Sequence, residues 1–249
     1  SYTGGYAARD QRVSARVTPL AGGSHLLVGR SGGAMRGYFG GFDGKGHTIS
    51  GMSFTETDGS TAGMFAVISG ETVVKNLNLI NCETKENTDA NYAGMIAGEL
   101  KANSTITNCT VSGNVSGTYA GGIVAKISYT GSITNCEFSG TVNGQRAGGI
   151  LASGDTTATI ENCTNHGTIV GTGYAGGIAA SCNGVLIDCI NDGNVSAIQA
   201  STLYAGGIAG SSGYVEGCHN RGSVYAGPVE SGNATSITAR AGGIAGGGG

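Results

Sequence analysis

The sequence predicts an all-β protein, a parallel β-solenoid (β-helix) of about seven coils, with roughly 27 residues and three short strands in each coil. Three observations lead to this fold. Glycine accounts for 49 of the 249 residues, short apolar strings recur at a nearly constant step, and 39% of the residues are hydrophobic while 12% are charged. This balance excludes a disordered chain. With two prolines and no glycine at every third position, the chain is not collagen either.

The first string is a strand built around alanine and glycine. It recurs as Ala62–Phe65, Ala93–Ile96, Ala120–Ile123, Ala147–Ile150, Ala175–Ile178, Ala205–Ile208 and Ala241–Ile244, with steps of 31, 27, 27, 28, 30 and 36 residues between the alanines. Short apolar runs that are bounded by glycine or asparagine are typical of strands rather than helices. Self-similarity at this period indicates a solenoid.

The second string ends in a cysteine. It recurs as Ile106–Cys109, Ile133–Cys136, Ile160–Cys163, Leu186–Cys189 and Val215–Cys218, and Leu77 and Met52 stand at the cysteine position of earlier units. Equivalent strands of successive coils pair in parallel about 4.8 Å apart, so equivalent residues form columns along the stack. We therefore expect an aliphatic column and a sulfur column inside the solenoid. Asn108, Asn135 and Asn162 should form an asparagine column at a corner.

The third string begins with glycine and recurs as Gly113–Val115, Gly140–Val142, Gly167–Ile169, Gly193–Val195 and Gly222–Val224. Residues 39–249 thus form the predicted solenoid. Residues 1–38 depart from the repeat and hold five of the eight arginines against one acid, Asp10. We expect this segment to be a polar cap over the first coil, because solenoid ends need a cover. A docking site for an acidic partner is the alternative.

The repeats resemble a known family. The opening Phe42–Gly51 and the glycine-glycine-isoleucine strands resemble the GLUG-motif repeats of large bacterial secreted and cell-surface proteins, including some immunoglobulin-A-cleaving metalloproteases. The resemblance covers about residue 39 to the end. It implies a spacer or adhesive stalk, secreted or on the bacterial surface, without shared catalytic residues. The metalloprotease signature His-Glu-x-x-His is absent from this sequence.

The seven cysteines do not form a metal-ligand pattern. Five of them are spaced by 27, 27, 26 and 29 residues, which is the coil repeat, and no Cys-x2-Cys cluster occurs. We expect buried free thiols and neither a metal nor a cofactor. Cys82 and Cys182 lie outside the predicted column and have no assigned place.

Two sets of residues invite a catalytic reading. Ser139, His166 and Asp192 fall on three consecutive coils, in the order of a nucleophile, a base and an orienting acid. A flat face offers no oxyanion hole. We therefore interpret His166, Asp192 and Arg221 as a surface ion ladder rather than as part of a catalytic triad. A polysaccharide-active β-helix enzyme would need paired carboxylates, and Glu161 and Glu216 lie two coils, or about 10 Å, apart. We therefore expect that the chain is not an enzyme.

A candidate ligand-binding row precedes the alanine-glycine strands: Tyr92, Tyr119, Arg146, Tyr174, Tyr204 and Arg240. An exposed aromatic row can stack on the sugar rings of glycans or of a host surface. The alternative is a row that stacks on itself, with arginine over tyrosine. The net charge of −3 gives no reason to expect nucleic acid, and no apolar run is long enough to span a membrane.

The most favoured function is therefore a non-catalytic adhesive or spacer segment. The alternative is a structural subunit that assembles head to tail into a filament, through the C-terminal coil around Ala241–Gly246. Inserts at Gln199–Thr202 and Pro228–Thr238 interrupt the last coils, and such loops often carry binding specificity. Because the chain begins at Ser1 without methionine, we expect a processed or excised piece of a longer protein.

Overall fold

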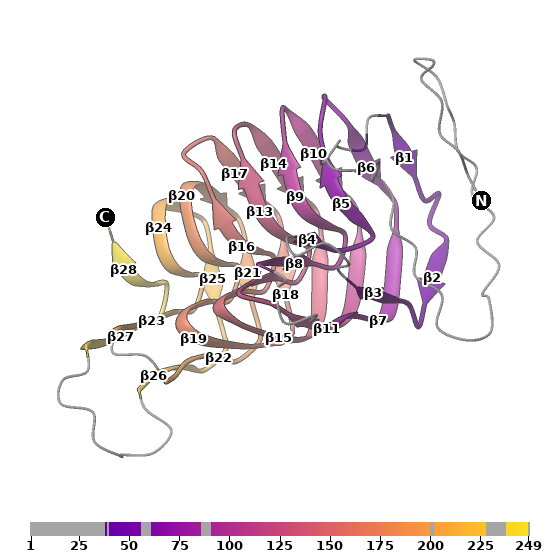
Figure 1. The fold of residues 1–249 in the computed structure, drawn as a ribbon. Coiled ribbons are helices and arrows are strands. Elements are labelled where there is room, and N and C mark those ends of the chain that lie inside the picture. The colour runs from indigo at the N-terminus through magenta and orange to yellow at the C-terminus, as the bar shows by residue number, and fades with distance from the viewer. Residues whose placement is uncertain are drawn as a thin grey trace.

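The computed structural model describes residues 38, 40–55, 61–85, 91–199, 202–227 and 238–248. Within these ranges every regular element is a β-strand and every strand pairing is parallel, so the predicted all-β parallel solenoid is confirmed (Figure 1). The predicted cap, residues 1–38, lies outside the described residues except for Tyr38. None of the described residues lies in a helix long and apolar enough to cross a membrane.

Four ladders of strands run along the stack. The first carries the alanine-glycine string: β4 (Thr61–Ala62), β8 (Tyr92–Gly94), β12 (Tyr119–Gly121), the ends of β15 (Glu137–Gly148) and β19 (Thr168–Gly176), β23 (Thr202–Gly206) and β27 (Thr238–Gly242). The second follows it: β5 (Phe65–Ile68), β9 (Ala97–Lys101), β13 (Val124–Ser128), β16 (Leu151–Gly154), the starts of β20 (Ala179–Ile187) and β24 (Ala209–Glu216), and β28 (Ala245–Gly248).

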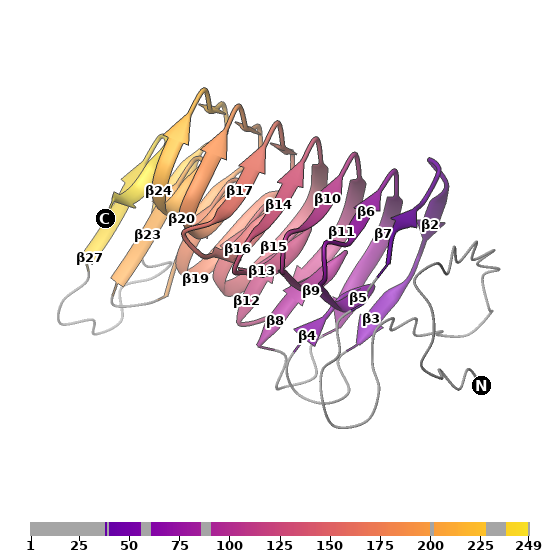
Figure 2. The same cartoon turned by 90° about the horizontal axis from the view of Figure 1, so that it is seen from above.

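The third ladder leads to the cysteines: β1 (Phe42–Asp43), β6 (Val73–Lys75), β10 (Ser104–Thr107), β14 (Gly131–Thr134), β17 (Ala158–Glu161) and the ends of β20 and β24. The fourth closes the coil: β2 (Thr48–Ser50), β3 (Ser53–Thr55), β7 (Asn78–Lys85), β11 (Thr110–Ser116), the starts of β15 and β19, β18 (Thr164–Asn165), β21 (Ile190–Asn191), β22 (Val195–Ala197), β25 (His219–Asn220) and β26 (Val224–Ala226). Figure 2 shows these ladders stacked along one axis.

The second ladder has seven strands within the described residues, so the chain completes six turns from its first strand to its last. The coil of β13, β14 and β15 has the three strands predicted, and the other coils between β5 and β27 have four. The alanine-glycine string bends after its first glycine, where the chain passes from the first ladder to the second on a neighbouring face. Only glycine permits this bend. A side chain at Gly121 would overlap the carbonyl oxygen of Val124, and one at Gly148 would overlap that of Leu151.

The core is a set of columns that run along the axis. Ile106 pairs with Ile133, and Ile133 pairs with Ile160, so the predicted aliphatic column is in register. The cysteine column points inward as predicted. Cys109, Cys136, Cys163 and Cys189 are buried and Cys218 is partly buried, and all five are free. Burial of such columns in successive coils is what makes the stack stable where a single coil is not.

One early member of the cysteine column is wrongly predicted. The backbone N–H of Thr110, which follows Cys109, bonds to the carbonyl of Leu77, as expected. In the coil before, however, the equivalent carbonyl belongs to His47, while that of Met52 accepts from the N–H of Glu83. Met52 therefore lies level with Cys82, in a different column. The first coil has its own spacing, so matching it to the later strings places Met52 wrongly.

The corner that follows the third ladder explains the predicted asparagine column. Asn76, Asn108, Asn135 and Asn162 have φ angles of 53, 53, 52 and 51°, in the left-handed region. Asparagine enters this region more readily than other residues with a side chain. The Asn108 side-chain Nδ2 donates to Asn76 Oδ1 at 2.6 Å, so at this step the corner amides also bond to each other.

Candidate functional site

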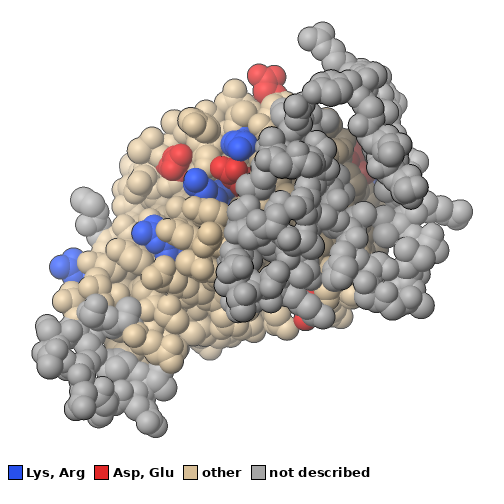
Figure 3. Space-filling model, in the orientation of Figure 1, with Lys and Arg blue, Asp and Glu red and all other residues tan. Residues whose placement is uncertain are grey.

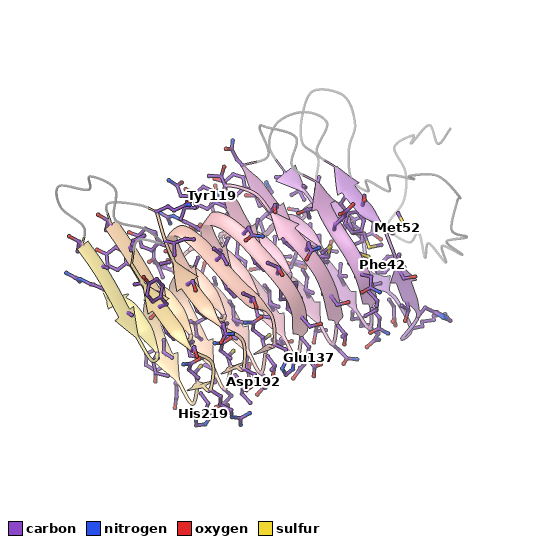
Figure 4. The ribbon with its side chains drawn as sticks, turned by 90° about the horizontal axis from the view of Figure 1, so that it is seen from below. Phe42, Met52, Tyr119, Glu137, Asp192 and His219 are labelled. Atoms are coloured by element: carbon purple, nitrogen blue, oxygen red, sulfur yellow. The ribbon has the colours of Figure 1, made fainter. Side chains whose placement is uncertain are left out.

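The predicted tyrosine-arginine row is in register along the first ladder. Tyr92 pairs with Tyr119, Tyr119 with Arg146, and Arg146 with Tyr174. The row continues from Tyr174 to Tyr204 and from Tyr204 to Arg240. The first five side chains are partly buried and that of Arg240 is exposed. Figure 4 shows Tyr119 on a different side of the stack from Glu137, Asp192 and His219.

The rings of this row cover one another. The centroids of Tyr92 and Tyr119 are 4.9 Å apart with the planes tilted by 31°, and those of Tyr174 and Tyr204 are 4.9 Å apart with an angle of 23°. Arg146 joins the two pairs, because its guanidinium carbon lies 5.3 Å from the Tyr119 centroid and 4.9 Å from that of Tyr174. These are cation–π contacts, which attract more strongly as they are desolvated.

Cations also stand at both ends of the row. Lys126 Nζ lies 5.4 Å from the Tyr92 centroid, and the Arg240 guanidinium carbon lies 5.6 Å from that of Tyr204. The faces of the rings are thus turned toward neighbours in the row. This is the self-stacked arrangement, and a sugar ring would have to approach the edges and hydroxyl groups of the tyrosines. Ligand binding by the row stays a prediction.

Most of the described surface on this face carries no charge. Figure 3 shows a small group of blue and red side chains that lie together, with a few others scattered on a largely uncharged described surface. One pair on β9 is an ion pair, with Lys101 Nζ 3.1 Å from Glu99 Oε2. Both side chains of this pair are partly buried.

In the column that contains Ser139, the next three members, His166, Asp192 and Arg221, form an ion ladder. His166 Nδ1 lies 3.3 Å from Asp192 Oδ2, and Arg221 Nη1 donates to Asp192 Oδ1 at 3.3 Å. In the described part of the chain no hydrogen bond joins Ser139 to His166. The His166 side chain is 47% exposed and that of Arg221 is 63% exposed, so water reaches the whole group. The contacts are those of the surface ladder rather than of an assembled triad.

The two carboxylates considered for glycoside chemistry lie as the spacing predicts. Glu161 pairs with Ile187, and Ile187 pairs with Glu216, so the apolar Ile187 side chain stands between them in the column. The Tyr214 hydroxyl donates to Glu216 Oε2 at 2.9 Å. A side-chain hydrogen bond with Glu216 also raises the pKa of Tyr214 above its ordinary value.

A polar groove of about 550 Å³ lies on the fourth ladder, across β3, β7, β11 and β15. Its lining includes Gly113, Gly140, Ser53, Glu83 and Ser112. The glycines are necessary here, because both have left-handed φ angles and a side chain on either would overlap the backbone of the coil beneath. Ser53 donates to Glu83 Oε1 at 2.5 Å. The groove was not predicted from the sequence.

A buried asparagine ladder on the inside of the fourth ladder was also not predicted from the sequence. Asn165, Asn191 and Asn220 pair in register on β18, β21 and β25. Asn165 Nδ2 donates to Asn191 Oδ1 at 2.7 Å, and Asn191 Nδ2 donates to Asn220 Oδ1 at 2.8 Å. Asn165 and Asn191 are fully buried. A signal was present, because Asn-x-Gly follows Cys163, Cys189 and Cys218 at the same distance each time.

Each of these amides fits against a glycine of the first string. A side chain at Gly149 would overlap the amide of Asn165, and one at Gly177 would overlap that of Asn191. Gly207 stands in the same relation to Asn220. The second glycine of the glycine-glycine-isoleucine string therefore makes room for the ladder. The two strings depend on each other although they are far apart in the coil.

The strand register shows where Cys82 and Cys182, which had no assigned place, lie in the coils. Cys182 lies between Gly154 and Ser212 on the second ladder, and Cys82 lies level with Gly113 on the fourth. Burial raises the pKa of Cys182 to about 11 and also raises that of Cys163 well above its ordinary value. These thiols are therefore neutral at physiological pH. Within the described residues no group of three or more His, Cys, Asp or Glu side chains is arranged to hold a metal ion.

The fold and these columns define the chain as a repeat protein of the parallel β-solenoid class. Residues 116–143 match the family model of the GLUG motif, which confirms the resemblance seen in the repeats. The structure is similar to a crystal structure of a "putative immunoglobulin A1 protease" from Bacteroides ovatus, with a TM-score of 0.64. The two sequences are 23% identical over 82% of this chain and 68% of the other, so the likeness is one of fold. No curated protein matches this chain.

Proposed function

We propose that this chain is a rigid, non-catalytic spacer segment of a secreted or surface-attached bacterial protein. The observation that carries the proposal is the continuity of its columns. The cysteine column, the buried asparagine ladder and the tyrosine-arginine row each pass from coil to coil in register. The six turns correspond to a rod of about 29 Å at about 4.8 Å per coil. The GLUG motif supports the proposed location, because such repeats occur in secreted and surface proteins.

Mechanical unfolding tests the spacer role. A rigid solenoid that is pulled from its two ends should release one coil at a time, since each coil is held mainly by its neighbours. A coil of roughly 27 residues releases about 90 Å of chain at 3.3–3.6 Å per residue. We expect force peaks at this spacing in single-molecule pulling. Smooth extension at low force, without regular peaks, would contradict the spacer proposal.

Adhesion is the second candidate, and the polar groove on β7 and β11 together with the tyrosine edges favours it. Hydroxyl, amide and carboxylate groups in a groove are the partners that a glycan can bond to. A glycan array tests both sites. If the row binds, the double variant Tyr119→Ala and Tyr174→Ala loses binding and keeps the fold. Tyr129→Ala is the matched control, because Tyr129 is 73% exposed and lies outside the row.

The outcomes separate the sites. If only the double variant loses glycan binding, the tyrosine-arginine row is the binding site. If the double variant binds glycans as the parent does, the row is not the binding site. Loss in Ser112→Tyr, which would fill the groove, assigns it to the groove instead. A parent chain that binds no arrayed glycan removes adhesion to these sugars and leaves the spacer role. Release of sugar from acidic polysaccharides, abolished by Glu161→Gln, would instead favour the enzymatic alternative.

A further inference from the structure

The buried asparagine ladder has a direction. The backbone N–H of Gly167 donates to Asn165 Oδ1 at 3.0 Å, and the N–H groups of Gly193 and Gly222 donate to Asn191 Oδ1 and Asn220 Oδ1. A backbone N–H can only donate, so the oxygen of each side-chain amide is identified and the nitrogen is the other atom. Each Nδ2 then points along the axis toward the later coil.

The last amide of the ladder has one donor left. Asn220 Nδ2 donates to the carbonyl of Gly222 at 2.9 Å, and Asn220 Oδ1 accepts from Asn191 Nδ2 and from Gly222 N–H. In Asn165 and Asn191 the second N–H of the same nitrogen bonds to the next asparagine. In Asn220 it bonds to none of the described residues. A donor that is buried without an acceptor costs on the order of 1–3 kcal/mol.

Gly243 provides an independent observation at the same edge. Side chains built on Gly149, Gly177 and Gly207 would overlap an asparagine amide, whereas one built on Gly243 meets no heavy atom of the described residues within 4 Å. Gly243 pairs with the coil below in the same way, since Gly207 lies against its carbonyl oxygen. The position beside Gly243 is therefore equivalent to the positions that the amides of Asn165, Asn191 and Asn220 fill beside the three earlier glycines.

The first coil does not match this edge. The inward column that contains the asparagines begins with Ile49, which pairs with Leu79, and continues through Val111 and Phe138. In a head-to-tail contact that continues the register, Ile49 of one molecule would stand over Asn220 of another. An isoleucine side chain has no acceptor, so the Asn220 donor would be buried unpaired.

We propose that the edge formed by β25, β26, β27 and β28 binds a strand that carries Asn-x-Gly, with its asparagine in register with Asn220 and beside Gly243. The partner is a solenoid coil of the same type as residues 189–197, not the first coil of this chain. Its side-chain oxygen accepts the free N–H of Asn220, and its backbone extends the fourth ladder by β-strand addition.

Peptide binding to the 249-residue chain tests this proposal. The probe is a fluorescent peptide of residues 185–198, which includes Asn191-Asp192-Gly193, under reducing conditions. The controls are the same peptide with Asn191→Leu and a peptide of residues 42–55 from the first coil. We expect the asparagine peptide to bind at least tenfold more tightly than either control in anisotropy titrations.

Two variants of the chain locate the site. Gly243→Ala adds a side chain where none is in contact, so it should fold normally and reduce binding of the asparagine peptide at least tenfold. Asn220→Leu should remove the preference between the asparagine and leucine peptides. Equal binding of all peptides to the parent, tighter binding of the 42–55 peptide, absence of binding, or an unaffected Gly243→Ala variant would each overturn the proposal.

Discussion

Replacement of Asn191 by leucine should destabilise the protein strongly, although leucine is apolar, of similar size, and placed in an apolar interior. Asn191 is fully buried and takes part in four hydrogen bonds: with Asn165, with Asn220, and with the backbone N–H and carbonyl of Gly193. In the Asn191→Leu variant each of these four groups loses its hydrogen bond to the Asn191 side chain. At about 1 kcal/mol for each bond, the free energy of unfolding should fall by about 4 kcal/mol.

Urea denaturation followed by circular dichroism measures this loss, provided that the transition is two-state. The matched control is Asn143→Leu, because Asn143 is exposed on β15, and there we expect a change within about 0.5 kcal/mol. If Asn191→Leu changes the free energy of unfolding as little as the control does, the ladder does not stabilise the stack and the reasoning is refuted.

Three further predictions concern single residues. Cys136→Ser places a hydroxyl in the buried sulfur column and should cost about 1–3 kcal/mol in urea denaturation, while native Cys136 should resist thiol reagents that label it rapidly in denaturant. Asn135→Ala should cost about 1–2 kcal/mol because Asn135 has φ 52°, whereas Asn135→Gly should cost less; equal losses would show that the corner conformation is not the cause. Burial raises the pKa of Cys182 from 9.0 to about 11, so the unfolded thiol ionises first and the folded state loses stability as pH rises from about 9 to about 11. Cys182→Ala should lessen that loss, and identical pH profiles for parent and variant would contradict the assignment.

The fold is predictable because a parallel in-register stack copies sequence spacing into space. The step of 27 residues from Ile106 to Ile133 becomes a direct pairing between β10 and β14. The same logic places the tyrosine-arginine row correctly before any contact is known. Whether the rings of that row face solvent or one another is a question of side-chain rotamers, which spacing does not determine.

The buried asparagine ladder was not predicted for a different reason. Asn165, Asn191 and Asn220 are followed by His166, Asp192 and Arg221, so the variable middle residue draws attention to the exposed column rather than to the buried one. Earlier members of the same column are Leu79, Val111 and Phe138, which are apolar. The column therefore has no single residue type along the chain, and only the register reveals it.

This change of residue type along one column makes the two ends of the stack chemically different. Where Leu79, Val111 and Phe138 fill the column, burial of apolar area holds adjacent coils together and does not distinguish one end from the other. Where asparagines fill it, Asn165 and Asn191 each donate to the side-chain oxygen of the asparagine in the next coil. The first kind of column accepts apolar neighbours on both sides, whereas a coil that follows a buried asparagine must supply an acceptor, because the donor is otherwise left unpaired. If the proposed recognition at Asn220 holds, we expect the asparagine end to be selective, and we expect self-assembly through the first coil to be disfavoured there, because Ile49 offers no acceptor to the Asn220 donor.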